Sequence, residues 1–178
     1  VRVAITPRTK GIMPVHLYGH PFLADEIEAI AREHGLAIYE DAAQAHGASW
    51  NGRPVGTIGD FGMFSLYPTK NMTSGEGGMV TCATEEIARN VRLLRNQGME
   101  KQYENEVVGF NARMTDIHAA IGRVQLTKVD AWTKLRQHNA SVLNQGLSGI
   151  AGVRTPAVAD GAVHVYHQYT IRVAAGER

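Results

Sequence analysis

Apolar residues along the first part of the chain recur at spacings that predict alternating strands and helices. Residues 13–17 form a short apolar run typical of a strand, and a turn signal follows at residues 18–21. Residues 24–34 then carry apolar side chains on one face of a helix, which Gly35 would cap. Residues 36–39 fit a short buried strand. The order strand, helix, strand within about thirty residues is that of a βαβ unit.

The next segment predicts two strands around a loop. Residues 48–59 are rich in turn formers. The apolar runs 61–66 and 79–82 fit two further strands, and the polar loop between them holds Lys70. This loop also contains the sequence Gly-Glu-Gly-Gly at residues 75–78.

Helical signals dominate the second half. Thr84 is a good N-terminal cap for a helix that would run to residues 97–98, because two glutamates follow it in the first turn. Residues 115–147 contain no proline and repeat apolar side chains at helical spacing, so they predict one long helix or two consecutive helices. Residues 163–173 fit a strand in a new segment.

These elements predict an α/β fold with two parts. Residues 1–148 would form part of a large domain with the long connecting helix, and residues 149–178 would begin a smaller C-terminal domain. The chain opens without Met inside an apolar run, and it ends just after a strand-like run. We therefore expect both ends to continue in a longer protein.

Composition and charge exclude several classes of protein. The net charge of +1 gives no broad electrostatic case for binding nucleic acid or an anionic membrane. No apolar run reaches the roughly 18 residues of a membrane span, and no signal peptide pattern is present at the start. The single cysteine, Cys82, excludes an internal disulfide and fits a reducing cytoplasm.

The main chemical signal is a lysine and a carboxylate that each follow an expected strand. Lys70 lies in the loop described above, and Asp41 closes the strand-like run at residues 36–39. Taken singly, Lys70 would be a solvated turn lysine and Asp41 a turn cap. Together they are the amine that can form an imine and the carboxylate that can hold a protonated ring nitrogen, as a pyridoxal phosphate enzyme requires.

The residues around Lys70 support a phosphate-bearing cofactor but not a nucleotide. Ser65 lies five residues before Lys70 and could bind a phosphate, or it could simply end a strand. Gly75, Gly77 and Gly78 permit a tight backbone path. They lack the Lys-Ser ending of a P-loop and do not open a helix as a dinucleotide fingerprint does. Binding of a nucleoside triphosphate or of NAD at this segment is therefore rejected.

Metal and hydrolase chemistry find no support. The eight histidines show no metal-ligand spacing, and His164 and His167, three apart in an expected strand, would point to opposite faces. With one cysteine and no serine in a nucleophile elbow, a hydrolase triad is also disfavoured.

Five ordered segments of the chain resemble the DegT/StrS family of pyridoxal phosphate-dependent sugar aminotransferases, which have the fold type I architecture. They are residues 4–19 (AITPRTKGIMPVHLYG), 40–48 (EDAAQAHGA), the lysine segment 65–78, 109–120 (GFNARMTDIHAA) and 164–172 (HVYHQYTIR). The resemblance covers nearly the whole chain. It implies the large domain of that fold, a mixed and mostly parallel sheet with flanking helices, in incomplete form.

The resemblance assigns five residues to the cofactor, pyridoxal 5'-phosphate. At the matching positions, Lys70 would bind the aldehyde carbon, Asp41 the pyridine nitrogen and Ser65 the phosphate. Gln44 would lie beside the phenolic oxygen, and Asn111 would reach the phosphate in the neighbouring subunit of a homodimer.

Two further residues, His46 and Arg113, are weaker candidates for anchoring substrate. A relative that removes a 3-hydroxyl carries histidine where this chain has Lys70, so Lys70 favours the transaminase branch. The family's phosphate cradle and stacking aromatic would precede Val1, and part of the sugar pocket would follow Arg178. Residues 97–98 are Gln-Gly where the family often has His-Gly. We expect the segment alone to be inactive.

The implied reaction transfers an amino group from an amino acid, glutamate by resemblance, to a keto-sugar nucleotide in two half reactions. Polysaccharide biosynthesis in the cytoplasm is the expected setting. Two alternatives stay open: another fold type I chemistry such as a lyase, which would share Lys70 and Asp41, and a cofactor-binding regulatory protein without turnover.

Overall fold

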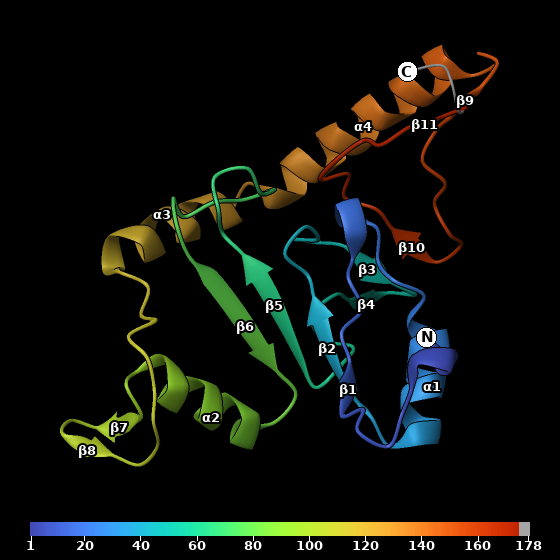
Figure 1. Cartoon of the computed structure of the whole chain (residues 1–178). Helices are drawn as coiled ribbons and strands as arrows, with labels where there is room; N and C mark the ends of the chain where they lie inside the picture. The colour runs from blue at the N-terminus through green and yellow to red at the C-terminus, as the bar shows by residue number, and fades with distance from the viewer. Residues whose placement is uncertain (175–178) are drawn as a thin grey trace.

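A four-stranded sheet lies at the centre of the computed structural model, which describes residues 1–174 (Figure 1). Its strand order is β1-β2-β5-β6. The first three strands are parallel, and β6 runs antiparallel to β5. The bounds are β1 Gly11–Ile12, β2 Ala37–Asp41, β5 Phe61–Ser65 and β6 Gly78–Cys82. The predicted α/β class with a mostly parallel sheet is therefore confirmed.

The predicted βαβ unit is present. Helix α1 (Ala24–His34) connects β1 to β2 and packs against both. Its first turn is acidic and its last turn is basic, which complements the helix dipole. Gly35 takes the left-handed conformation at φ 61° and donates its N–H to the carbonyl of Ala31, as expected of a C-terminal cap.

The first strand lies earlier than predicted. The expectation of a strand over residues 13–17 was wrong, because β1 ends before Pro14. A single bridge from Val15 to Asp41 follows, and then a 3-10 turn, η2 (Leu17–Gly19). Proline has no N–H to donate to a neighbouring strand. Only the carbonyl of Pro14 forms a backbone hydrogen bond here, which it accepts from the Asp41 amide at 3.0 Å.

The helices of the second half follow their local signals. The Thr84 hydroxyl accepts the Ile87 amide at 3.2 Å and caps α2 (Glu85–Arg95), which ends before residues 97–98. Of the two alternatives for residues 115–147, two consecutive helices are observed, α3 (Asp116–Leu126) and α4 (Val129–Leu147).

Short strand pairs complete the chain. The turn-rich segment 48–59 contains a hairpin, and β10 pairs with its first strand. A second hairpin follows α2, and the last pair lies beside the end of α4 (Figure 1). The bounds are η1 Arg2–Ala4, β3 Ser49–Trp50, β4 Arg53–Pro54, β7 Met99–Lys101, β8 Glu104–Asn105, β9 Val153–Arg154, β10 Ala162–Val163 and β11 Arg172–Val173.

The predicted strand over residues 163–173 is wrong. Between β10 and β11 the chain forms a loop at residues 164–171, with Tyr166 at φ 46°. The loop amides bond to the η2 turn instead of a neighbouring strand: Val165 donates to the Gly19 carbonyl at 3.0 Å and Gln168 to the Tyr18 carbonyl at 3.2 Å. His164 and His167 therefore do not lie on opposite faces of a strand.

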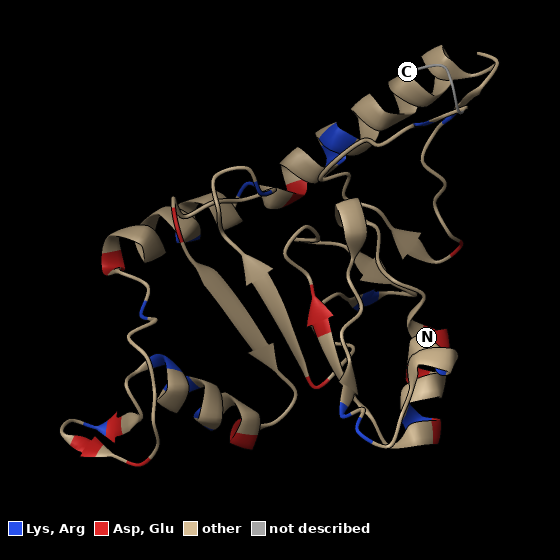
Figure 2. Cartoon of the chain, viewed as in Figure 1, with Lys and Arg blue, Asp and Glu red and all other residues tan. Residues whose placement is uncertain are grey.

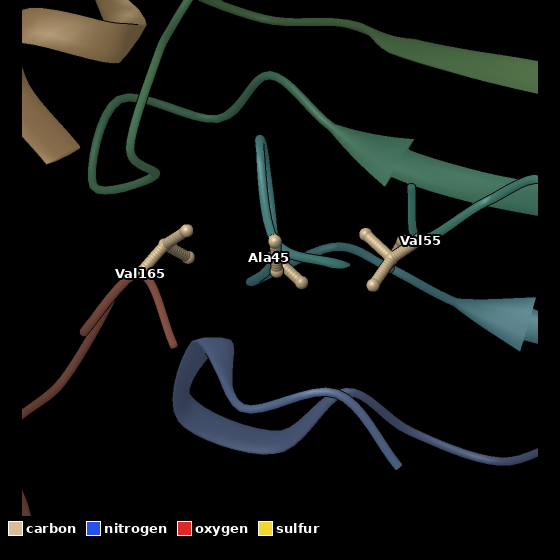
Figure 3. Packing of buried hydrophobic residues seen from close by; sticks show 5 residues of the cluster. Ala45, Val55 and Val165 are labelled. Atoms are coloured by element: carbon tan, nitrogen blue, oxygen red, sulfur yellow. The ribbon is translucent and has the colours of Figure 1, made fainter. Parts of the chain in front are cut away.

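Val165 anchors this loop in the hydrophobic core. It is fully buried and belongs to a cluster with Ala42, Ala45, Ala48 and Val55, as Figure 3 shows for the labelled residues. The loop is thus fixed against the segment that follows β2. The proposed boundary between residues 148 and 149 stays a prediction, and β10 beyond it pairs with β3.

Charges of both signs are spread over the elements (Figure 2). Among residues 1–174, no helix is long and apolar enough to cross a membrane.

A buried carboxylate, Glu40, holds three segments together. Its Oε2 accepts from His16 Nε2 at 3.0 Å and from the Gly56 amide at 2.7 Å, and its Oε1 accepts the amides of Ile58 and Gly59 at 2.6 and 2.8 Å. Burial alone would raise the pKa of Glu40, but these hydrogen bonds outweigh it and hold that pKa below its usual value.

We expect Glu40→Ala to lower the free energy of unfolding by about 3–5 kcal/mol, because it leaves buried donors without a partner. Urea unfolding of the full-length protein measures this. A carboxylate with a lowered folded pKa stabilises the fold above its unfolded pKa and loses that effect as the pH falls through the folded one. The difference in the free energy of unfolding between Glu40→Ala and wild type should therefore be largest at neutral pH and decrease in acid. Glu26→Ala, at an exposed carboxylate of α1, is the control, and equal midpoints for the two variants would contradict the role of Glu40.

Candidate active site

The predicted cofactor residues of β2 and β5 meet at the carboxyl ends of these two strands. Asp41 ends β2 and Ser65 ends β5. In the parallel register Asp41 lies opposite Met63, two residues before Ser65. Because side chains alternate along a strand, the side chains of Asp41 and Ser65 lie on the same face of the sheet. This end of the strands is where open α/β sheets bind ligands.

Asp41 is fixed by its backbone and keeps one carboxylate oxygen available. Its amide and carbonyl bond to Pro14 and His16 at 3.0 Å each. Its Oδ1 accepts the Ala43 amide at 3.1 Å, so Asp41 does cap the turn after β2, as expected of it when taken singly. Among residues 1–174, no partner binds Oδ2. The half-buried carboxylate can therefore cap the turn and bind a cation at the same time.

Gln44 presents an amide nitrogen to the same region. Its Oε1 accepts the backbone N–H of Tyr18 at 2.7 Å, so its Nε2 is the group left to donate. A donor at this place suits a phenolic oxygen. Tyr18 has φ 60° and Gly19 φ 93°. A Cβ at Gly19 would lie 2.8–3.0 Å from Val165, the His167 amide and the Gln44 carbonyl, so only glycine fits this turn.

The Lys70 loop is closed by short-range hydrogen bonds. The Lys70 amide donates to the Tyr67 carbonyl at 3.0 Å, and the Tyr67 amide donates to Ser65 Oγ at 3.3 Å. The glycine segment folds back along β5, where the Leu66 amide bonds to the Gly77 carbonyl at 2.9 Å. The lysine therefore sits on a short, anchored turn directly after Ser65.

His46 is buried without hydrogen-bond partners for its ring. It is 6% exposed, its ring lies 5.4 Å from that of Phe64, and neither ring nitrogen bonds to a described residue. Burial lowers its pKa to about 4, and the neighbouring His167 and Lys70 lower it further. His46 lines an apolar groove of about 630 Å³ between the sheet and α3. A neutral His46 can donate or accept a hydrogen bond, but it cannot supply a positive charge to a substrate.

Two residues that the sequence analysis did not assign to the site, Asn71 and His167, lie near Lys70. Asn71 is 4% exposed, donates to the Val165 carbonyl at 3.2 Å and contacts His167 Nδ1 at 3.0 Å. Asn71 follows Lys70 directly, and His167 belongs to the segment 164–172 used for the resemblance. Only the position of Lys70 could have drawn attention to Asn71.

Asn111 and Arg113 are not brought to the other site residues within this chain. Both are exposed on the segment between β8 and α3, away from the end of β2 (Figure 1). Arg113 Nη1 donates to Asn96 Oδ1 at 2.9 Å and lies 3.4 Å from Gln97 Oε1, while Asn111 forms a backbone bridge with Asn96. Among residues 1–174, no group of three metal-ligating side chains forms a cluster.

The donor set fits pyridoxal phosphate. A free carboxylate oxygen on Asp41 suits the pyridine nitrogen, the Ser65 hydroxyl suits a phosphate, and Lys70 supplies a primary amine. The amide nitrogen of Gln44 completes the set with a donor for the phenolic oxygen. The end of β2 and the residues after it supply Asp41 and Gln44, and the end of β5 and the loop after it supply Ser65 and Lys70.

Comparisons with known proteins agree with this chemistry. The model of the DegT/DnrJ/EryC1/StrS aminotransferase family matches residues 1–178. The dTDP-3-amino-3,4,6-trideoxy-alpha-D-glucose transaminase of Streptomyces venezuelae is 42% identical over 97% of this chain and 46% of its own length. A pleiotropic regulatory protein of Geobacillus stearothermophilus is 43% identical over 97% of this chain and 47% of its own length.

A crystal structure of DesV from S. venezuelae in complex with a ketimine intermediate superposes with a TM-score of 0.94 at 41% identity. The match covers 98% of this chain and 47% of that one. The chain thus spans about half the length of the curated relatives it matches.

Proposed function

The chain belongs to the DegT/DnrJ/EryC1/StrS aminotransferase family, and from this we propose that the full-length protein is a pyridoxal phosphate-dependent sugar aminotransferase. It would transfer an amino group from an amino acid, glutamate, to a keto-sugar nucleotide. The observation that supports this best is the meeting of Asp41, Ser65 and the Lys70 loop at the carboxyl ends of β2 and β5. The name of the transaminase relative supports the substrate class.

Besides Lys70, three residues of the same chain would hold the cofactor. When bound, pyridoxal phosphate supplies an aldehyde and a ring that withdraws electrons. The Asp41 carboxylate would keep the ring nitrogen protonated, and the turn bond from Ala43 keeps this carboxylate in place. The Ser65 hydroxyl would donate to the phosphate, and Gln44 Nε2 would donate to the phenolic oxygen.

Lys70 would perform two tasks in turn. Its Nζ would bind the cofactor covalently at the aldehyde carbon. Once the amino-acid donor has displaced it, the same Nζ would take up a proton from one carbon and return it to another, as a general base and acid. The anchored turn after β5 keeps the amine within reach throughout.

Transfer of a labelled amino group tests this function. The full-length protein is incubated with ¹⁵N-glutamate and a keto-sugar nucleotide, and the sugar product is analysed by mass spectrometry. Label in the sugar supports the proposal. Breakdown of substrate without transfer of label would instead indicate a lyase.

The regulatory alternative rests on the relative from G. stearothermophilus, which is named a regulatory protein. A protein of this kind would bind the cofactor with a normal absorption spectrum and show no half reaction with glutamate. The spectrum of the bound cofactor before and after addition of glutamate separates the two functions.

We further propose that the active unit is a homodimer with shared sites. Asn111 is exposed on the segment between β8 and α3, where its backbone forms a bridge with Asn96, so its side chain is free to reach a second subunit. Beside it, α3 exposes Ile117, Ile121 and Val124, which share one helical face. An exposed apolar face of this kind favours contact with a partner, and a two-fold interface would use it twice.

Mixed dimers test the shared site. Lys70→Ala and Asn111→Ala homodimers should each be nearly inactive. In a mixed dimer one site collects both substitutions and the other has neither, so activity should recover toward that of one normal site. The control uses Asn105→Ala, at an exposed asparagine of β8, in place of Asn111→Ala. The Asn105→Ala homodimer should keep full activity. No recovery after verified exchange of subunits, or a fully active monomer in sedimentation, would contradict the shared site.

A further inference from the structure

Asn71 joins the Lys70 loop to the 164–171 loop. It is buried and follows Lys70 directly in the chain. Its Nδ2 donates to the carbonyl of Val165 at 3.2 Å, and its Oδ1 lies 3.0 Å from His167 Nδ1. Val165 is itself fully buried in the core. One amide side chain therefore fixes His167 relative to the backbone of the lysine loop.

These contacts determine the tautomer of His167. The amide nitrogen of Asn71 is committed to the Val165 carbonyl, so the amide oxygen faces the ring. An amide oxygen only accepts, and His167 Nδ1 must therefore carry the hydrogen. In the neutral ring the lone pair then lies on Nε2, which has no hydrogen-bond partner among residues 1–174.

Titratable groups from three elements lie near this ring. Lys70 lies on the loop after β5, Arg136 on α4, and His46 on the connection after β2. Burial lowers the pKa of His167, and the charges of Lys70 and Arg136 lower it further, so the ring is neutral near pH 7. His46, with a pKa of about 4, is also neutral there.

Of the two cations that act on His167, Arg136 is held by a backbone carbonyl, and the Lys70 amine is bonded to no group within residues 1–174. Arg136 donates Nη1 to the Tyr166 carbonyl at 3.2 Å. In the described part of the chain, the Lys70 amine makes no hydrogen bond or ion pair. Lys70, Asn71 and Arg136 line one hollow of about 460 Å³, which leaves room for the lysine side chain to turn.

We propose that His167 Nε2 accepts a hydrogen bond from the Lys70 amine and that His167 is thereby a positioning residue for the reactive lysine. One N–H directed at Nε2 sets the direction of the amine lone pair, and no proton is transferred to the ring. This inference rests on the proposed function, since only a reacting lysine needs to be oriented.

Two substitutions separate positioning from structural support. His167→Asn keeps a donor near the place of Nδ1 for Asn71 but has no group at Nε2. His167→Gln loses that donor and offers an amide oxygen near the place of Nε2. We expect kcat to fall about tenfold in His167→Asn with KM within about twofold, and His167→Gln to recover part of kcat. The reverse ranking, with native kcat in His167→Asn, would overturn the proposal.

A second measurement does not depend on turnover. In the full-length protein without cofactor, ¹⁵N NMR should show His167 as the Nδ1–H tautomer. Lys70→Met should raise the pKa of His167, because a cation that disfavours the imidazolium is gone, while Lys10→Met, at an exposed lysine, should not. The other tautomer, or a pKa insensitive to Lys70, would overturn the proposal. Absence of amino transfer from ¹⁵N-glutamate would instead refute the proposed function, and cofactor labelling at a different lysine would remove the role of Lys70; both outcomes would leave these NMR results standing.

Discussion

Replacing Lys70 with alanine should reduce turnover by about a thousandfold or more while leaving the fold intact. The substitution removes both the covalent attachment and the proton-transferring base, and general acid–base catalysis alone contributes about 10²–10⁴-fold. Lys70 lies on a loop and its side chain is only half-buried, so we expect a change in stability of about 0.5–1 kcal/mol at most. Steady-state kinetics and urea unfolding of the full-length protein measure the two effects.

Reduction with borohydride should attach the cofactor to the peptide that contains Lys70. Peptide mapping by mass spectrometry identifies the labelled residue. Lys10→Ala, at an exposed lysine, serves as the control and should retain activity and labelling. If Lys10, Lys101 or another lysine carried the label, the assignment of Lys70 would be wrong.

Elements with strong local signals could be predicted from the sequence. The cap at Thr84 and the acidic first turn that follows are sufficient to begin α2, and Gly35 ends α1 because few other residues accept its conformation. The runs that became β2, β5 and β6 are apolar and bounded by turn formers. These properties depend on residues near one another in the sequence.

Elements set by distant contacts could not be predicted. Apolar residues from 163 to 173 fit a strand, yet Val165 is instead drawn into the core and the loop amides bond to the η2 turn. The first strand was displaced by Pro14, whose missing N–H the hydrophobic pattern does not report. Tertiary contacts therefore outweighed the local pattern in the loop at residues 164–171, whereas Pro14 is a local signal that the prediction of a strand over residues 13–17 overlooked.

The site also contains residues that could be placed from the sequence and residues that could not. Asp41 and Ser65 could be placed together because parallel strands end at one edge of a sheet. The contact between Asn71 and His167 joins residues 96 apart, and it depends on the docking of a loop that was predicted as a strand. His46 was predicted as a candidate for binding substrate. Its burial could not be predicted, because the small residues beside it in the sequence give no pattern of apolar side chains.

Replacing Asp41 with asparagine should lower the rate about a hundredfold or more. The amide keeps the shape of the side chain, and its oxygen can still accept the Ala43 amide, so the turn should persist. What is lost is the negative charge opposite the ring nitrogen. Removing one partner of a buried ion pair costs about 3 kcal/mol or more, and each 1.36 kcal/mol corresponds to about a tenfold change in rate.

Asp60→Asn provides the matched control for this substitution. Asp60 is also half-buried, and its Oδ2 accepts the Ile38 amide at 2.8 Å, but it lies before β5, at the opposite end of that strand from Ser65. Both variants therefore exchange a carboxylate for an amide beside a backbone N–H, and only Asp41→Asn removes a charge from the site. We expect Asp60→Asn to keep kcat within about twofold, whereas Asp41→Asn loses both rate and affinity for the cofactor. Near-native rates in Asp41→Asn would mean that Asp41 only caps the turn after β2.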